Sequence, residues 1–334
     1  MKKTVAGRHA FHGLEPELVL GLVEDELGLR LTNLFRPLTS YINKVYEVEK
    51  RRGGNLIIKF YRPGRWTDRA LEDEHAFLQE LAAREIPTVP PLKLASGGTL
   101  GAARGLRYAI FAKRGGRSHD EYSDEQWLEI GRLLGRIHSV GAVRAARHRL
   151  TMAPEHSTAR HLQSLLKGSI VPAELKDSLE RVCGTIIDEI RPLFAGSERI
   201  RIHGDCHYAN LLHRPGEPLL LIDFDDMAMG PPVQDLWMLL PGRPAESLAE
   251  IDLFLEGYET FRPFDRRSLR LIEPLRAMRY IHYMAWLARQ VADDGDTRAI
   301  DDFGSEEYWH KEIRDLQEQL ERIRQGPPSF GNLV

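Results

Sequence analysis

The stretch that decides the fold reads His203-Gly204-Asp205-Cys206-His207-Tyr208-Ala209-Asn210 and is followed, after an apolar run, by Asp223-Phe224-Asp225-Asp226. The asparagine stands five residues after the first aspartate, and Asp223 stands thirteen residues beyond the asparagine. The apolar run at 219–222 and the residues just before the motif are typical of short β-strands. The pattern predicts a β-like insert at residues 200–223 that carries polar side chains in its loop.

Asp205, Asn210 and Asp223 have the spacing of a phosphoryl-transfer site. Such a site needs few covalent partners, because the protein chiefly positions a hydroxyl, holds Mg²⁺ on the nucleotide and neutralises developing charge. In the kinase arrangement an aspartate accepts the hydroxyl proton, an asparagine five residues on binds Mg²⁺, and a later aspartate at a strand end completes the metal site. The spacing therefore predicts Asp205 and Asp223 as catalytic residues, with Asn210 and Asp223 as the Mg²⁺ ligands.

Three other interpretations of this stretch stay open. Aspartate and asparagine are ordinary turn residues, so the spacing could belong to turns alone. His203, Cys206 and His207 could contribute to a zinc site, although no second Cys/His pair with matching spacing follows them. Cys206 could act as a nucleophile beside His207, but the neighbouring carboxylate and amide groups would then have no role.

A strand lysine in the first third of the chain supplies a further part of a kinase site. Residues 44–49 alternate in polarity, residues 51–54 hold two glycines, and residues 55–61 are apolar and β-branched, which predicts a hairpin. Lys59 lies inside the second strand, where an unpaired ammonium is costly to bury. Glu74 follows fifteen residues later in a predicted helix at 68–84. We expect Lys59 and Glu74 to pair and to orient the α and β phosphates of ATP.

The segment ahead of the hairpin, Pro37-Leu38-Thr39-Ser40-Tyr41-Ile42-Asn43, occupies the place of a phosphate-covering loop. It contains no glycine, so its backbone approaches phosphates less freely. We therefore expect the Ser40 hydroxyl and neighbouring amide groups to reach the nucleotide. A simple turn serine is the alternative.

The character of the chain changes near residue 113. Strands and helix are mixed before it, with the last strand at 107–112, and Lys113-Arg114-Gly115-Gly116-Arg117 is typical of a linker. Beyond it, Ser123-Asp124-Glu125-Gln126 fits a capping box, and helical patterns recur at 173–193, 245–260, 269–291 and 305–325. The sequence predicts an α+β, two-lobed protein-kinase-like fold. Residues 1–112 form a small antiparallel-sheet lobe with one main helix, which binds the nucleotide, and residues 113–334 form a larger, mainly helical lobe for catalysis and substrate.

The composition of the 334 residues narrows the class of protein. The 46 basic and 49 acidic residues leave a net charge of −3, whereas nucleic-acid-binding proteins usually carry a basic excess. Two cysteines in so long a chain favour a reducing compartment. No signal-peptide core follows the charged start, and no stretch approaches the ~18 apolar residues of a membrane span. We expect a cytoplasmic monomer that binds neither nucleic acid nor membrane.

With these residues in place, the chain resembles the bacterial stress response kinase A family of serine/threonine protein kinases. That family lies within the aminoglycoside phosphotransferase and choline kinase superfamily of protein-kinase-like folds, and the resemblance covers residues 11–310. The His-Gly-Asp signature at 203–205 marks only the superfamily. The other segments that carry the resemblance are Ser40-Tyr41-Ile42-Asn43-Lys44-Val45-Tyr46, Ile58-Lys59-Phe60-Tyr61-Arg62-Pro63, Gln234-Asp235-Leu236-Trp237-Met238-Leu239-Leu240 and Glu273-Pro274-Leu275-Arg276-Ala277-Met278-Arg279.

The resemblance implies ATP-dependent phosphorylation of protein Ser and Thr, autophosphorylation and a role in surviving stress. It also implies that Asp205 is the catalytic aspartate and that Asn210 and Asp223 bind Mg²⁺. Ser40 is implied to lie at the ATP phosphates. Two residues depart from ordinary protein kinases: His207 stands where those kinases place a lysine, and Asp225 replaces the glycine after the metal aspartate. Both departures are normal for the superfamily, so they do not favour a protein substrate.

Other expectations concern the acceptor and regulation. A small alcohol such as an aminoglycoside, choline or homoserine is the alternative acceptor, and a nucleotide-binding regulator without turnover is the alternative class of protein. Only eleven residues separate Asp223 from Asp235, which leaves no room for a long activation segment, so loop phosphorylation is not expected to switch the enzyme on. Asp235 is expected to be structural, either as an N-cap or as an anchor of the catalytic loop.

Adenine is expected near Phe111-Ala112-Lys113. The helix at 272–289 has an aromatic and cationic face that could contact an acceptor or belong to the core. Its residues are Arg276, Arg279, Tyr280, Tyr283 and Trp286.

Overall fold

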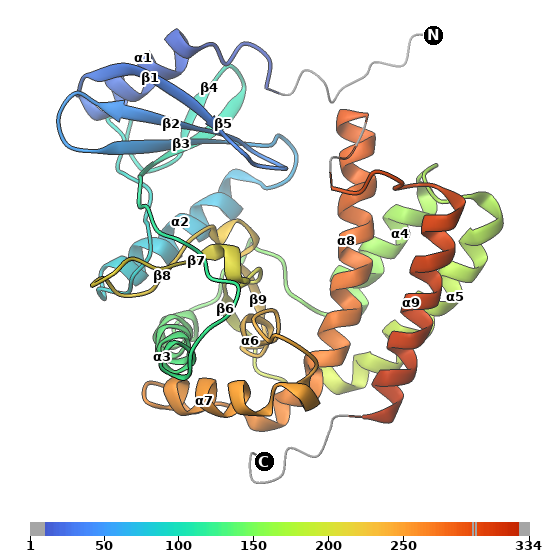
Figure 1. Cartoon of the computed structure of the whole chain (residues 1–334). Coiled ribbons are helices and arrows are strands. Elements are labelled where there is room, and N and C mark those ends of the chain that lie inside the picture. The colour runs from blue at the N-terminus through green and yellow to red at the C-terminus, as the bar shows by residue number, and fades with distance from the viewer. Residues whose placement is uncertain (1–10, 296, 298, 327–334) are drawn as a thin grey trace, which may run out of the picture. The chain divides into compact units, whose positions relative to one another are not determined.

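A computed structural model describes residues 11–295, 297 and 299–326 (Figure 1). These residues form two compact units, and the chain passes between them several times. The first unit runs to Ser118 and also takes Ala146–Arg149 and Ala209–Asp225, while the second takes His119–Ala145, Leu150–Tyr208 and the chain from Asp226 onward. The lobe boundary between residues 112 and 113 stays a prediction.

The first unit is built on a five-stranded antiparallel sheet in the order β1-β2-β3-β5-β4. Its strands are β1 Leu31–Leu38, β2 Lys44–Lys50, β3 Asn55–Tyr61, β4 Gly101–Ala103 and β5 Leu106–Ala112. The predicted hairpin is confirmed, since β2 pairs with β3 across a turn in which Gly53 and Gly54 have positive φ. The register sets Lys59 opposite Val45 on one side and Ala109 on the other, inside the sheet.

Helix α1, Pro16–Leu27, covers one face of this sheet (Figure 1). Its buried residues Val19 and Val23 belong to one core cluster with Ile58 and Phe60 of β3. The helix ends at Gly28, which has the left-handed backbone that glycine adopts most readily. The sequence pattern predicts one main helix in this part of the chain, and α1 is a second, shorter one.

Helix α2, Asp68–Ala82, covers the opposite face and confirms the helix expected at 68–84. Thr67 caps it by accepting a hydrogen bond from Ala70 N at 3.2 Å. Leu71 packs with Ala109 of β5. Because directly opposed residues of antiparallel strands share a face, Lys59 points to this same side of the sheet.

The predicted β insert contributes a small hairpin to the first unit. Strand β7, Leu211–Leu212, pairs antiparallel with β8, Leu220–Leu221. The linker after β5 is bound to it, since Arg117 and His213 exchange two backbone hydrogen bonds of 2.9 Å. A Cβ at Gly116 would lie 2.7 Å from Leu212 Cβ, so glycine lets the linker lie directly on the hairpin.

A second small sheet lies in the second unit, where β6, Ile200–Ile202, pairs antiparallel with β9, Ala228–Gly230. Helix α6, Gln234–Trp237, follows closely. The eleven residues between Asp223 and Asp235 include β9 and the first residue of α6. They leave no room for a long activation segment, as the sequence predicts.

Helices α3, Asp124–Gly141, and α7, Leu248–Glu259, pack with their backbones in contact. A Cβ at Gly131 would lie 2.1 Å from the Phe254 carbonyl oxygen, and one at Gly257 would lie 2.2 Å from that of Leu128. No side chain larger than glycine fits at these positions without movement of a backbone. We call this contact the α3–α7 seam.

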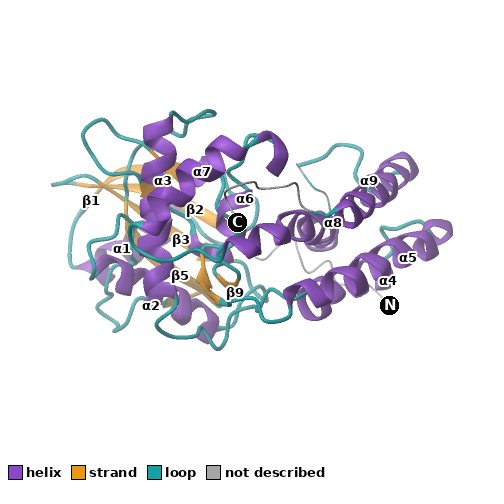
Figure 2. Cartoon of the chain, turned by 90° about the horizontal axis from the view of Figure 1, so that it is seen from below, coloured by secondary structure: helices purple, strands orange, loops and turns teal. Residues whose placement is uncertain are grey.

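The remaining long helices of the second unit pack together (Figures 1 and 2). They are α4 Ala159–Lys167, α5 Ala173–Ile190, α8 Ile272–Asp294 and α9 Glu306–Gln325. Helices α5, α7, α8 and α9 confirm the helical segments expected after residue 173, whereas the sequence pattern does not predict α4. The capping box at the start of α3 is also present. No described helix is long and apolar enough to cross a membrane.

Short helical turns join these elements. They are the π-turn Pro154–Thr158 and the 3₁₀ turns Arg191–Phe194, Tyr208–Asn210, Phe224–Asp226, Pro244–Glu246 and Arg266–Leu271. The chain holds one small antiparallel-sheet unit and one larger, mainly helical unit, which confirms the predicted α+β architecture.

Candidate functional site

Lys59 is buried in the first unit between two carboxylates. Its Nζ lies 3.0 Å from Asp223 Oδ1 and 2.7 Å from Asp225 Oδ1. Burial disfavours the charged ammonium, but the charges of Asp223 and Asp225 outweigh burial and raise the pKa of Lys59 above its ordinary value. Lys59 is therefore a fixed cation on the α2 side of the sheet.

Asp225 lies at the centre of the charges around Lys59. It also accepts hydrogen bonds from Arg65 Nη1 at 3.0 Å and from Asn43 Nδ2 at 2.5 Å, and its side chain is 7% exposed. The Asn43 amide oxygen in turn accepts a hydrogen bond from Arg62 N at 3.1 Å, which fixes the orientation of the amide. Two cations and an amide thus stabilise one buried carboxylate and hold the segment after β8 against β3.

Glu74 does not pair with Lys59, and the expectation of that ion pair is wrong. Its Oε2 lies 3.5 Å from Arg149 Nη1 instead. Burial raises the pKa of Glu74 to about 8, and the nearby Asp225 charge adds to the effect. The physical reason is that a buried lysine needs an anion, and the loop after β8 already supplies two.

Arg149 is the last residue of the segment Ala146–Arg149, which belongs to the first unit, and it contacts several elements of that unit. Its guanidinium lies over the Trp66 ring, 4.0 Å from the centroid, and donates hydrogen bonds to the carbonyl oxygens of Ala70 and Asp225. Arg149 therefore joins α2 to the loop after β8. We call this set of ionisable groups the Lys59 cluster: Lys59, Arg65, Glu74, Arg149, Asp223 and Asp225.

Asn210 and Asp223 lie at the same end of the β7–β8 hairpin. Ile222 N donates a hydrogen bond to the Asn210 carbonyl oxygen at 3.0 Å, and Asp223 is the next residue. Asp223 has a φ of 62°, in the left-handed region that few residues other than glycine adopt, and its side chain is 53% exposed. A carboxylate and an amide oxygen are donors that suit Mg²⁺, so the pair fits a nucleotide-borne Mg²⁺. The ligand role itself stays a prediction.

Ser40 lies in the exposed turn between β1 and β2. Its Oγ accepts a hydrogen bond from Asn43 N at 3.3 Å. This geometry is that of a serine turn, so the role of Ser40 at the ATP phosphates stays a prediction.

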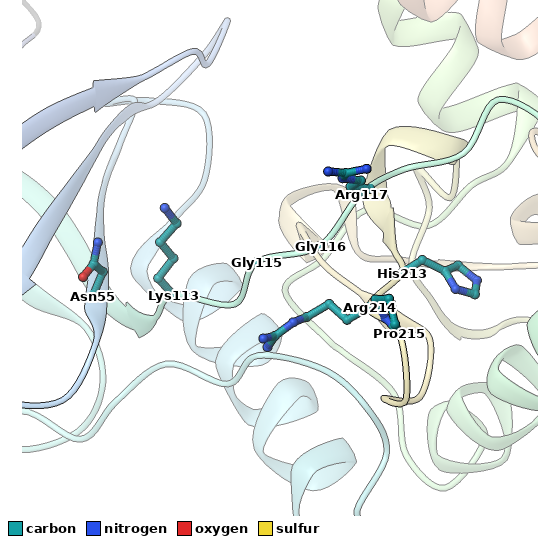
Figure 3. Close-up of a pocket in the computed structure, with 8 residues that line it drawn as sticks. All are labelled: Asn55, Lys113, Gly115, Gly116, Arg117, His213, Arg214 and Pro215. Atoms are coloured by element: carbon teal, nitrogen blue, oxygen red, sulfur yellow. The ribbon is translucent and has the colours of Figure 1, made fainter.

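A basic pocket opens beside the linker of the first unit (Figure 3). Lys113, next to which adenine is expected, lies at its edge and donates a hydrogen bond to Glu47 Oε1 at 2.5 Å. Burial of Glu47 is outweighed by hydrogen bonds from Lys113, Asn55 and Arg36, which lower its pKa to about 2. The lining residues are Asn55, Lys113, Gly115, Gly116, Arg117, His213, Arg214 and Pro215.

The loop that carries Asp205 lies in the second unit and is bound to Asp235. Asp235 accepts a hydrogen bond from His203 N at 2.7 Å through Oδ2 and from Gly204 N at 2.8 Å through Oδ1. His138 Nε2 lies 3.0 Å from the same Oδ2, and the side chains of Asp235 and His138 are both 0% exposed. These contacts confirm that Asp235 anchors the loop. We call His138, His203, Gly204 and Asp235 the Asp235 scaffold.

Gly204 gives this loop its shape. Its φ is +86°, and a Cβ there would lie 2.2 Å from the Asp226 carbonyl oxygen. Its own carbonyl oxygen accepts a hydrogen bond from Gln234 Nε2 at 3.1 Å, and Gln234 Oε1 accepts one from Trp237 Nε1 at 2.9 Å. The Gln-Asp-Leu-Trp segment therefore holds the loop at two successive residues.

Asp205 lies between two basic side chains. Arg279 Nη2 lies 2.9 Å from Oδ1, and His207 Nε2 lies 3.5 Å from Oδ2. Burial alone would raise the pKa of Asp205, but the hydrogen bond from His207 and the charge of Arg279 hold it well below its ordinary value. Its side chain is 20% exposed, so Asp205 is an ionised carboxylate that solvent still reaches.

The cysteine alternatives find no support in this geometry. Cys206 is fully buried, and burial raises the pKa of its thiol, which leaves little thiolate for nucleophilic attack. His203 is also buried, and its Nδ1 accepts a hydrogen bond from Asp205 N at 3.2 Å. Across the residues that the structure describes, no group of three or more His, Cys, Asp and Glu side chains could hold a metal ion.

The aromatic and cationic face of α8 divides into two parts. The Arg276 guanidinium lies over the Trp237 ring at 5.0 Å and so takes part in packing. Tyr283 and Trp286 stack on each other with ring centroids 5.4 Å apart. Arg279 alone of the named basic residues on this face reaches Asp205.

Four residues that contact Lys59 or the carboxylates near it were not predicted from the sequence. They are Asn43, Arg65, Arg149 and Asp225. A signal existed for Asp225, because a buried lysine needs an anion and this aspartate stands two residues past Asp223. No local pattern marks Arg149, since it is remote in sequence from both Glu74 and Asp225.

The model of the phosphotransferase enzyme family matches residues 35–272. Stress response kinase A of Escherichia coli (strain K12) is 34% identical over 319 residues, which cover 95% of this chain and 96% of the relative. Serine/threonine protein kinase RdoA of Salmonella typhimurium is 34% identical over 322 residues, with the same coverage of 95% and 96%.

Solved structures share the fold at low sequence identity. The amicoumacin kinase hAmiN, in complex with AMP-PNP, Ca²⁺ and amicoumacin, has a TM-score of 0.74 and 17% identity over 96% of this chain and 97% of its own. Choline kinase LicA from Streptococcus pneumoniae has a TM-score of 0.63 and 18% identity over 90% and 98% of the two chains. These similarities confirm the predicted protein-kinase-like fold.

Proposed function

Because the chain belongs to the phosphotransferase enzyme family, and within it to the stress response kinase A family, we propose that it transfers the γ-phosphoryl group of ATP to Ser and Thr hydroxyls of proteins. The observation that carries the protein acceptor is the 34% identity to serine/threonine protein kinase RdoA over 95% of this chain. Autophosphorylation and a role in a bacterial stress response belong to the same proposal, as do a cytoplasmic location and a monomeric state.

The first unit supplies the nucleotide side of the proposed reaction. Lys59 would bind the α and β phosphates, because it is a permanent cation held on one face of the sheet. Ser40 and neighbouring amides would bind the terminal phosphates. The adenine would lie near Phe111-Ala112-Lys113, beside the basic pocket of Figure 3.

Asn210 and Asp223 would hold Mg²⁺ on the nucleotide. A metal held by these two residues would supply positive charge against the charge that develops on the phosphate oxygens. The half-exposed carboxylate of Asp223 supports this role, because it can exchange its contact with Lys59 for a contact with a ligand. Asp225 would keep Lys59 in position while Asp223 does so.

Glu74 takes a different part from the one first expected. Glu74 contacts Arg149, and Arg149 in turn donates a hydrogen bond to the Asp225 carbonyl oxygen. Through Arg149, Glu74 would help to position the Lys59 cluster without touching the nucleotide.

Asp205 would orient the acceptor hydroxyl and accept its proton. Its low pKa keeps it ionised, and the Asp235 scaffold fixes the loop that carries it. The bonds from Asp235 to two successive backbone amides leave the loop little freedom to move.

Phosphorylation of a small alcohol is the second candidate function. The observation that favours it is the shared fold of the amicoumacin and choline kinases, whose names state small-molecule acceptors. The histidine at 207 agrees with it, since ordinary protein kinases place a lysine there.

Labelled ATP with Mg²⁺ separates these functions. The protein is incubated alone, with a generic protein substrate and with a panel of small alcohols, and Asp205→Asn is the matched control. Label on protein Ser or Thr that Asp205→Asn fails to deposit supports the proposal. Label on a small alcohol alone would replace it with the second candidate, and nucleotide binding without transfer would leave a regulator.

A further inference from the structure

Arg279 stands beside Asp205 although the two are far apart in sequence. It projects from α8, and its Nη2 lies 2.9 Å from Asp205 Oδ1. Ala277, Met278 and Ile281 are buried around it on the same helix, so α8 cannot turn to withdraw the guanidinium. An ion pair with a cation on a rigid helix favours one orientation of the Asp205 carboxylate.

The charge around Asp205 comes from few groups. The groups that face it are His203, His207 and Arg279, together with the buried thiol of Cys206. An imidazole as a class changes charge near neutral pH, whereas a guanidinium stays charged. Of these described groups, Arg279 is the one that carries a permanent positive charge.

Ordinary protein kinases carry a lysine two residues after the catalytic aspartate, and His207 occupies that position here. We propose that Arg279 is a positioning residue of the phosphoryl transfer, which fixes the Asp205 carboxylate and supplies from α8 the permanent cation that the loop itself lacks. The inference rests on the proposed function.

The transfer defines what Arg279 must do. The acceptor oxygen forms a bond to the γ phosphorus, the bond from that phosphorus to the bridging oxygen breaks, and ADP leaves with the electron pair. The acceptor proton passes to the Asp205 carboxylate. Since a carboxylate offers about four lone-pair sites, Asp205 can accept this proton while Arg279 holds Oδ1.

The test compares Arg279→Gln and Arg279→Lys with Arg289→Gln, an exposed arginine on the same helix whose ion pair is with Asp293. We expect Arg279→Gln to lower kcat about 10²-fold while KM for ATP changes by less than about threefold. Arg279→Lys should regain about tenfold of that loss, because it restores the charge without the fork geometry. Arg289→Gln should match the unmodified protein.

Two further measurements separate positioning from a merely structural role. Added ethylguanidine should restore part of the activity of Arg279→Ala, and the acid limb of kcat/KM should move to higher pH in Arg279→Gln, because loss of the cation raises the pKa of Asp205. Circular dichroism and melting temperature check that each variant folds. If Arg279→Gln does not fold, the rescue of Arg279→Ala and the activity of Arg279→Lys decide the question.

Full kcat in a folded Arg279→Gln would overturn the inference and leave the proposed function intact. A higher KM for the acceptor at unchanged kcat would also overturn it, because Arg279 would then bind the acceptor. Transfer by Asp205→Asn at the unmodified rate would instead defeat the proposed function.

Discussion

The Lys59 cluster and the Asp235 scaffold both contain buried carboxylates, but the partners of these carboxylates differ in kind. In the cluster, carboxylates meet the ends of long cationic side chains, and the Asp223 side chain is 53% exposed. In the scaffold, Asp235 is 0% exposed and accepts from two backbone amides that belong to the loop it holds.

This difference separates a region that can rearrange from one that cannot. Ion pairs between flexible side chains can be exchanged for a ligand at moderate cost, whereas a buried carboxylate that loses a backbone partner leaves an unsatisfied polar group. The cluster is thus suited to receive a charged ligand, and the scaffold is suited to keep one loop in place.

Asp223→Asn should give the largest effect and should show it in activity alone. We expect Mg·ATP-dependent transfer to fall about 10³-fold, because the variant would lose the charged side chain of the proposed metal site. The melting temperature should change by less than about 2 °C, since the side chain is half exposed. Labelled ATP measures transfer, and differential scanning calorimetry measures the melt.

Titration calorimetry with and without Mg²⁺ adds a control on the same variant. Binding of Mg·ATP should weaken more than binding of metal-free nucleotide. Equal losses in both would remove Asp223 from the metal site.

Asp235→Asn should affect stability and activity together. The amide can no longer accept from both His203 N and Gly204 N while facing His138, so we expect the free energy of unfolding to fall by about 3 kcal/mol. Urea unfolding measures the change, and Asp252→Asn, an exposed carboxylate on α7, is the control. Lost activity at unchanged stability would contradict the distinction between scaffold and cluster.

Gly257→Ala tests the α3–α7 seam on which the scaffold depends. Its Cβ would lie 2.2 Å from the Leu128 carbonyl oxygen, so we expect a loss of about 2 kcal/mol in unfolding free energy. Gly184→Ala on α5 is the matched control, because no heavy atom lies within 4 Å of its Cβ position. That helix-interior change should instead stabilise the protein by about 0.5 kcal/mol. Opposite signs in thermal unfolding are the expected result, and equal effects would contradict the close contact.

Glu74→Gln should have the smallest effect and a clear pH dependence. The pKa of Glu74 is raised to about 8 by burial, so the folded protein keeps a proton that the unfolded chain releases above its ordinary pKa. Stability therefore falls as pH rises through the window between those two values, and glutamine removes this loss. We expect the variant to gain stability relative to the unmodified protein steadily as the pH is raised from about 5 to about 8. A difference that does not change with pH would contradict the raised pKa.

Much of the fold could be predicted because its signals are local. Residues 55–61 show the strand pattern of β3, and Ser123 with Gln126 forms the capping box that begins α3. Helix α1 is the exception in this respect, since it depends on packing Val19 and Val23 against a sheet that forms later in the chain.

The candidate site could be predicted only in part. Asp205, Asn210 and Asp223 lie within one short stretch at characteristic spacings, so sequence alone could propose them. The partners of Glu74 and Asp205 could not be assigned in this way, because Arg149 and Arg279 reach them from segments remote in sequence. The error over Glu74 has the same origin, since Asp225 and Glu74 compete for one lysine and only the fold decides between them.

The α3–α7 seam also bears on how such an enzyme can diversify. His138 Nδ1 on α3 lies 3.0 Å from the Tyr258 hydroxyl on α7, and His138 Nε2 lies 3.0 Å from Asp235 Oδ2. The position of the loop with Asp205 therefore depends on two helices whose backbones are in contact. We therefore expect that exposed residues of α8 such as Arg289 can vary while the loop keeps its place, because the loop is held through α3 and α7.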